Sequence, residues 1–251
     1  MDRRTERKRF LLLFTILIIS VAGLAYELVA GTMATYLIGQ PINQFSYAMG
    51  WFLASMGFGS YLSRYIKLKL LDALIKLQIF LSLSGGFSAM IMFFFFAYTD
   101  TVYPIFLILA FLIGTCVGLE IPLLLRLIGK YRILAVAVSD VFTYDYIGAL
   151  LASLLFPLVL LPELGILRTS LVFGGMNLLA AWIMLTLIKT HKKKYSAILI
   201  IAALILISGF IGAEKITKLL EDSLYQDPVV FSATTKYQRI VITKCMQKRR
   251  T

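Results

Sequence analysis

The chain has 251 residues, of which 60% are hydrophobic and 15% are charged, and its formal net charge is +12. Soluble globular domains are about 45–50% apolar and about 25% charged, so this composition excludes an ordinary soluble domain and predicts a multi-pass helical membrane protein. Because the basic residues stand in short clusters between apolar runs, the charge favours anionic lipid of the bilayer as its partner and not nucleic acid.

Residues 1–9 form a basic tail, which is followed by a predicted membrane domain at residues 10–213. A helix of about 20 mostly apolar residues crosses a bilayer. The sequence predicts about seven such spans, at 10–30, 44–62, 72–98, 102–125, 140–162, 166–188 and 195–213. The first span lacks a small-residue cleavage site, so we expect it to stay in place as a signal anchor.

Every second connection between these spans, counting the N-terminal tail as the first, carries a cluster of basic residues. They are Arg3, Arg4, Arg7, Lys8 and Arg9 in the tail, then Arg64, Lys67 and Lys69, then Arg126, Lys130 and Arg132, and finally Lys192, Lys193 and Lys194. The connections at 39–43, 98–101 and 163–165 are nearly free of Lys and Arg. The positive-inside rule therefore predicts a multi-pass protein of the plasma membrane with a cytoplasmic N-terminus.

Ionisable residues stand inside the predicted spans at Glu27, Glu120 and Asp145. A charge is costly in hydrocarbon, so these side chains are expected to face the interior of the bundle. Two interpretations stay open. The three carboxyl groups form an intramembrane polar site, for instance for a cation, or they are buried carboxylates bonded to neighbours such as Arg126. Asp140 and Asp145 also fit residues that flank the start of the fifth span.

Small residues recur at four-residue spacing, which lets helices approach closely. The pairs are Gly114 with Gly118, Gly148 with Ala152, and Ser55 with Gly59. Close packing within the bundle is the main interpretation, and the face of a homo-oligomer is the alternative.

Metal chemistry is not predicted. His191 is the single histidine and lies in a lysine run without ligand partners. Cys116 and Cys245 are not placed to form a disulfide. The sequence contains no catalytic triad and no glycine-rich phosphate loop.

The chain changes character after residue 213. Residues 214–223 form a short linker of mixed charge, and 224–251 contain two alternating segments at 228–233 and 237–244. This pattern predicts a β-hairpin. The expected fold class is therefore an all-α multi-pass membrane bundle of about seven spans, followed by a short C-terminal β-hairpin from a truncated α/β domain.

Several stretches together resemble the membrane domain of the integral-membrane spermidine synthases, which are polyamine aminopropyltransferases. These stretches are GLAYELVAGT at 23–32, YLIG at 36–39, QFS at 44–46, MGFGSYLSR at 56–64, GLEIP at 118–122 and DYIGALLASLLFP at 145–157. YQDPVVFS at 225–232 and TKYQRIVIT at 235–243 resemble the start of the catalytic domain of that family.

The resemblance implies transfer of an aminopropyl group from decarboxylated S-adenosylmethionine to putrescine, which gives spermidine and methylthioadenosine. Decarboxylated S-adenosylmethionine is a co-substrate here, and no resident cofactor is implied. Gln238 matches the family's glutamine that contacts the nucleoside product. The family's nucleoside loop and catalytic aspartate have no counterpart, so this chain by itself is expected to be inactive, with no catalytic residue of its own.

Two other functions stay open from the sequence. One is a transporter for polyamines or other cations, with Glu27 and Glu120 as cation ligands. The other is a membrane subunit that docks a soluble enzyme. The side of the membrane also stays open for the C-terminus, because seven spans would place it outside, whereas the chemistry implied by the resemblance is cytosolic.

Overall fold

A computed structural model describes residues 3–67, 69–99, 102–130, 133–187, 192–224, 229–234 and 239–243. The helices are α1 (Arg3–Ile38), α2 (Pro41–Leu62), α3 (Leu70–Gly86), α4 (Ser88–Tyr98), α5 (Val102–Ile128), α6 (Leu134–Leu155), α7 (Leu161–Leu187) and α8 (Lys192–Leu224). A 3₁₀ turn, η1 (Ser63–Tyr65), follows α2, and a π-helical turn, η2 (Phe156–Leu160), joins α6 to α7. The strands are β1 (Val229–Thr234) and β2 (Arg239–Thr243).

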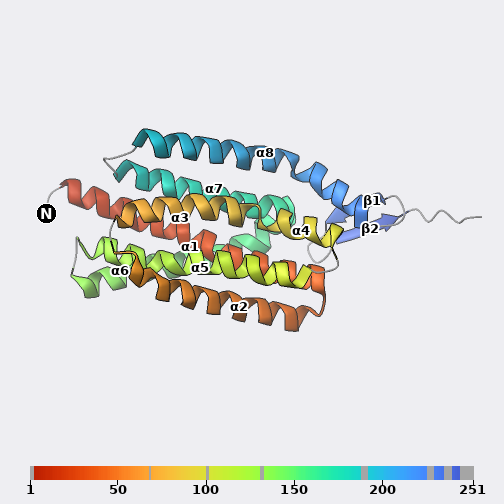
Figure 1. The fold of residues 1–251 in the computed structure, drawn as a ribbon, viewed down its shortest axis with the longest axis horizontal. Helices are drawn as coiled ribbons and strands as arrows, with labels where there is room; N and C mark the ends of the chain where they lie inside the picture. The colour runs from red at the N-terminus through yellow and green to blue at the C-terminus, as the bar shows by residue number, and fades with distance from the viewer. Residues whose placement is uncertain are drawn as a thin grey trace, which may run out of the picture.

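The helices run along one long axis, with α1 in the middle (Figure 1). α1 packs against α2, α5, α6 and α7, and the other large contacts join α2 to α5, α3 to α7, and α7 to α8. Of the most apolar window of α1, 78% is buried inside the protein. A helix that is apolar on all sides is expected to be surrounded in this way.

Glycines bring the backbones of α2 and α5 into contact. A Cβ atom added to Gly59 would lie 1.9 Å from the carbonyl oxygen of Thr115, and one added to Gly118 would lie 2.0 Å from that of Met56. No side chain fits at either position. The prediction that the small residues serve close packing within the bundle is confirmed for this pair of helices.

The prediction of about seven spans is wrong. Among the residues that the structure describes, five helical stretches are long and apolar enough to cross a membrane. They are Glu6–Leu37, Leu70–Tyr98, Val102–Ile128, Leu134–Leu187 and Lys192–Ile216. The predicted span at 44–62 lies in α2, which is not among them. These stretches are defined by length and composition alone, so the structure does not show that they lie in a membrane.

The predicted fifth and sixth spans lie in α6 and α7, and the backbone is kinked at Gly165, inside the connection expected at 163–165. The chain passes Pro157 in the π-helical turn η2 and leaves the helical conformation at Gly165, where φ is 69°. Figure 1 shows that α6 and α7 run in opposite directions along the bundle. The chain therefore reverses its direction through the π-helical turn and the kink at Gly165, without an extended loop.

Strands β1 and β2 pair antiparallel, with Phe231 opposite Ile242 and Thr234 opposite Arg239. They form a two-stranded sheet, and no other strand occurs in the described part of the chain. The predicted fold class is therefore corrected to a helical bundle with this one pair of strands, and the described residues contain no α/β domain. In Figure 1 the strands lie at the end of the bundle opposite the start of α1.

Candidate functional site

Four polar side chains from four helices meet in the interior of the bundle. They are Tyr26 of α1, Gln78 of α3, Glu120 of α5 and Asn177 of α7, and each is at most 2% exposed. We call these four residues the polar cluster. Sequence reasoning selected only Glu120, because it is the ionisable one. An uncharged polar side chain inside an apolar run is the signal that would have found Gln78 and Asn177.

Hydrogen bonds connect the cluster through α3. The amide Nε2 of Gln78 donates to Oε1 of Glu120. One turn further along α3, the carbonyl oxygen of Leu81 accepts the hydroxyl of Tyr26 at 3.3 Å. The Tyr26 oxygen in turn accepts Nδ2 of Asn177 at 3.0 Å. Two short chains of hydrogen bonds therefore lie side by side on one helix.

Two glycines make room for this arrangement. A Cβ atom added to Gly85 would lie 2.5 Å from the ring of Tyr26, so only glycine lets the ring lie against α3. A Cβ atom added to Gly23 would lie 3.9 Å from Oε2 of Glu120. The second carboxyl oxygen of Glu120 is therefore directed toward α1.

The polar cluster contains more hydrogen-bond acceptors than donors. Oε1 of Gln78 and Oδ1 of Asn177 are buried, and no donor among the described residues reaches either atom. A buried polar atom without a partner costs about 1–3 kcal/mol. Since native interiors contain few such atoms, two in one cluster require an explanation.

Two further carboxyl groups lie nearby. Asp145 of α6 is half-buried and accepts the hydroxyl of Ser20. Glu27 is 6% exposed and makes no hydrogen bond or ion pair with any described residue. It follows Ser20 by two helical turns and Gly23 by one, so all three lie on one face of α1.

Of the two kinds of partner expected for a buried Glu120, the structure shows a neighbouring polar side chain, Gln78, and not Arg126. Arg126 donates to the carbonyl oxygens of Ile66 at 2.8 Å, Ser63 at 2.5 Å and Pro122 at 3.2 Å. Its guanidinium group therefore holds the turn after α2 against α5. The carboxyl group of Glu120 receives no ion pair from the described residues.

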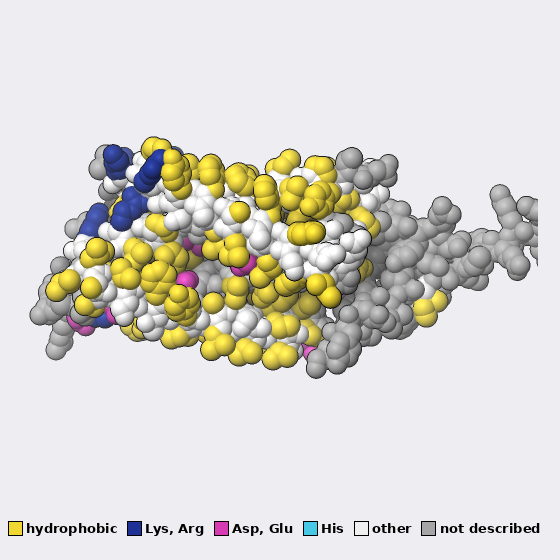
Figure 2. All heavy atoms as spheres, turned by 90° about the horizontal axis from the view of Figure 1, so that it is seen from below, with side chains coloured by type: hydrophobic (Ala, Val, Ile, Leu, Met, Phe, Trp, Pro, Cys, Tyr) yellow, Lys and Arg dark blue, Asp and Glu magenta, His cyan; other side chains and the backbone are white. Residues whose placement is uncertain are grey.

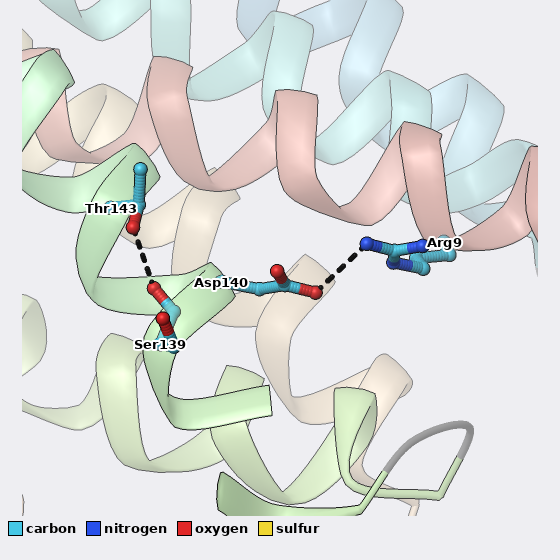
Figure 3. A network of polar contacts seen from close by, with 4 residues as sticks. All are labelled: Arg9, Ser139, Asp140 and Thr143. Atoms are coloured by element: carbon cyan, nitrogen blue, oxygen red, sulfur yellow. Dashed lines mark hydrogen bonds and ion pairs between the residues drawn. The ribbon is translucent and has the colours of Figure 1, made fainter. Parts of the chain in front are cut away.

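Asp140 does not belong to the polar cluster either. Its Oδ2 lies 3.0 Å from Nη2 of Arg9, and both side chains are 22% exposed (Figure 3). In the next turn of α6, the hydroxyl of Thr143 donates to the carbonyl oxygen of Ser139 at 2.8 Å. Arg9 and Asp140 tie the first turns of α1 to the first turns of α6.

Figure 2 shows acidic side chains inside a hollow in the middle of one long face, surrounded by hydrophobic side chains. A small, partly open space also lies beside Tyr26. Its volume is about 20 Å³, and Ser88 is the other polar residue in its lining. That is room for about one water molecule.

The remaining site predictions are tested only in part. Gln238 lies outside the described residues. In the described part of the chain, no group of three or more His, Cys, Asp or Glu side chains is arranged to hold a metal ion. The arrangement can therefore offer carboxyl, amide and hydroxyl oxygens to a hydrogen-bond donor.

Fold and site together define an elongated helical bundle with apolar surfaces and a buried cluster rich in oxygen atoms. No family model matches the chain, and no solved structure matches it. Several curated proteins do match. A polyamine aminopropyltransferase of Leptospira interrogans is 42% identical over 239 residues, which are 93% of this chain and 47% of that protein.

Two other relatives carry the same name. Polyamine aminopropyltransferase 2 of Ralstonia nicotianae is 37% identical over 251 residues, covering 95% of this chain and 49% of that protein. Polyamine aminopropyltransferase 1 of Streptomyces coelicolor is 33% identical over 251 residues, covering 97% of this chain and 47% of that protein. The chain is thus homologous to the polyamine aminopropyltransferase (spermidine synthase) family, and it spans about half the length of these relatives.

Proposed function

We propose that this chain forms the membrane-embedded half of a polyamine aminopropyltransferase. The observation that carries the proposal is the alignment, which covers 93% of this chain but 47% of the relative from Leptospira interrogans. The aligned half contains five helical stretches of sufficient length and apolarity to span a bilayer. The catalytic domain then lies in the half of the relatives that does not align with this chain.

In the proposed reaction a neutral amine of putrescine attacks the aminopropyl carbon beside the sulfonium of decarboxylated S-adenosylmethionine. The new C–N bond forms as the C–S bond breaks, methylthioadenosine leaves, and the amine loses a proton. Both substrates are cations, so acidic side chains suit their binding, and one base suffices for the proton. In this proposal the membrane half anchors and positions the catalytic half.

The distribution of basic side chains supports a cytoplasmic location for the end of the bundle at which α1 begins. Lys and Arg side chains gather at one end of it (Figure 2). They come from the start of α1, the connection after α2, the end of α5 and the start of α8, and include Arg7, Lys8, Arg64, Lys67, Lys69, Lys130, Lys192, Lys193 and Lys194. By the positive-inside rule this end faces the cytoplasm in the plasma membrane.

A chimera tests the proposal. This chain replaces the matching half of the Leptospira interrogans protein, and the product is expressed in cells that lack their own aminopropyltransferase. We expect spermidine formation in the membrane fraction that survives an alkaline wash. The unmodified relative is the positive control. A soluble chimera, or a chimera that is inactive although present in the membrane in normal amount, contradicts the proposal.

A further inference from the structure

We propose that the polar cluster is a binding site for a primary ammonium group, in which Glu120 supplies the charge and the amide oxygens of Gln78 and Asn177 supply acceptors. This inference concerns the membrane bundle itself. It does not depend on the transferase activity proposed above.

The charge balance of the interior is the first argument. Glu27, Glu120 and Asp145 have no basic partner among the described residues. The ion pairs of the described residues join Arg9 to Asp140 and Arg168 to Glu214, both away from the cluster. Buried carboxylates in proteins are normally paired, and a membrane makes the missing partner more costly.

The hydrogen-bond balance is an independent argument. Gln78 is 0% exposed and Asn177 is 1% exposed, yet the carbonyl oxygen of each amide lacks a donor. The Nε2 of Gln78 donates to Glu120, so the free Oε1 belongs to the same amide group that contacts the carboxyl group. What is missing from the cluster is therefore both a positive charge and a set of donors.

A primary ammonium group supplies both, because it carries one charge and three N–H donors and has no acceptor. A divalent metal ion fits less well. Calcium takes six to eight oxygen ligands, and the described residues contain no group of three carboxylate, histidine or cysteine side chains around one point.

Putrescine is the probe, and its uncharged analogue 1,4-butanediol is the matched control ligand. Equilibrium dialysis of the whole chain in lipid nanodiscs at pH 7 measures binding. Glu120→Gln keeps the shape and the acceptor for Gln78 but removes the charge, so we expect at least about tenfold weaker binding of putrescine. Glu163→Gln, at an exposed position of α7, is expected to bind like the parent chain.

A second variant guards against loss of the fold. Asn177→Ala removes one acceptor without touching the carboxyl group, and we expect binding to weaken several-fold while the thermal midpoint shows a folded chain. Equal binding of putrescine by the parent and Glu120→Gln would overturn the proposal. So would displacement of putrescine by Na⁺ or K⁺ as effectively as by methylammonium, which would indicate a site for any monovalent cation.

Infrared spectroscopy addresses the competing explanation, in which Glu120 is protonated and its O–H donates to a rotated amide of Gln78. We expect putrescine to remove a protonated-carboxyl band that is absent from Glu120→Gln. Persistence of that band at saturating putrescine would overturn the proposal.

Discussion

At the scale of single residues, the fit of Tyr26 against α3 depends on the absence of a side chain. The ring lies where a Cβ atom of residue 85 would lie, and its hydroxyl accepts Asn177 while it donates to Leu81. Tyr26 cannot move aside without breaking both hydrogen bonds. Gly85 is therefore a sensitive position in a part of the chain where the sequence alone shows only small and apolar residues.

We expect Gly85→Ala to destabilise the protein by about 1–3 kcal/mol, because the new methyl group meets the Tyr26 ring at 2.5 Å. The measurement is the thermal midpoint in detergent. Gly175→Ala in α7 is the matched control, since nothing lies within 4 Å of the added atom there. That variant is expected to be neutral or stabilising by about 0.5–1 kcal/mol, because alanine favours a helix over glycine. Equal effects of the two variants would contradict the packing described for Tyr26.

At the scale of elements, two kinds of contact join the helices: direct backbone contact and ion pairs between side chains. α2 and α5 touch through their backbones at Gly59 and Gly118. α1 and α6 are joined at one end by Arg9 and Asp140. A side chain can rotate away from an added atom and a carbonyl group of a helix cannot, so the first kind of contact tolerates less change.

Gly118→Ala is expected to cost about 3 kcal/mol, because the added atom lies 2.0 Å from the Met56 carbonyl oxygen and the helices must separate. Gly57→Ala on the open face of α2 is its control, with no atom within 4 Å. Thermal midpoints measure both. A loss for Gly118→Ala no larger than that for Gly57→Ala would show that α2 and α5 are not packed as described.

The Arg9–Asp140 pair is expected to contribute about 1 kcal/mol of coupling energy, since both side chains are only 22% exposed. A double-mutant cycle with Arg9→Gln and Asp140→Asn measures this coupling. The same cycle with Arg168→Gln and Glu214→Gln is the comparison. We expect a smaller value there, because the Glu214 side chain is 81% exposed. The reverse order of the two couplings would count against the geometry in Figure 3.

At the scale of the whole molecule, hydropathy found the helices but not the helices they pack against. The connection expected at 163–165 contains the kink at Gly165, whereas the π-helical turn η2 around Pro157 has no signal in the hydropathy. Burial of Glu27 and Glu120 was predictable from the cost of charge in hydrocarbon. Gln78 and Glu120 are hydrogen-bonded although they are 42 residues apart in the sequence, and no local sequence pattern predicts such a pair.

The orientation proposed for the bundle predicts different labelling at its two ends. Cysteine introduced at Glu163 or at Lys193 occupies an exposed position in each case. In intact cells we expect a membrane-impermeant maleimide to label Glu163→Cys and to label Lys193→Cys only after lysis. The control is the parent chain, with Cys116 and Cys245 present. Labelling of both positions, or of Lys193→Cys alone, would contradict a cytoplasmic basic end.

The central place of α1 sets the order in which the protein can be completed during synthesis. α1 leaves the ribosome first, yet α6 and α7, which pack against it, are made more than 90 residues later. Until then Tyr26 lacks Asn177, and Ser20 lacks Asp145. The earliest helix is thus enclosed late, and the hydrogen bonds of its few interior polar side chains can form only after α6 and α7 have been made.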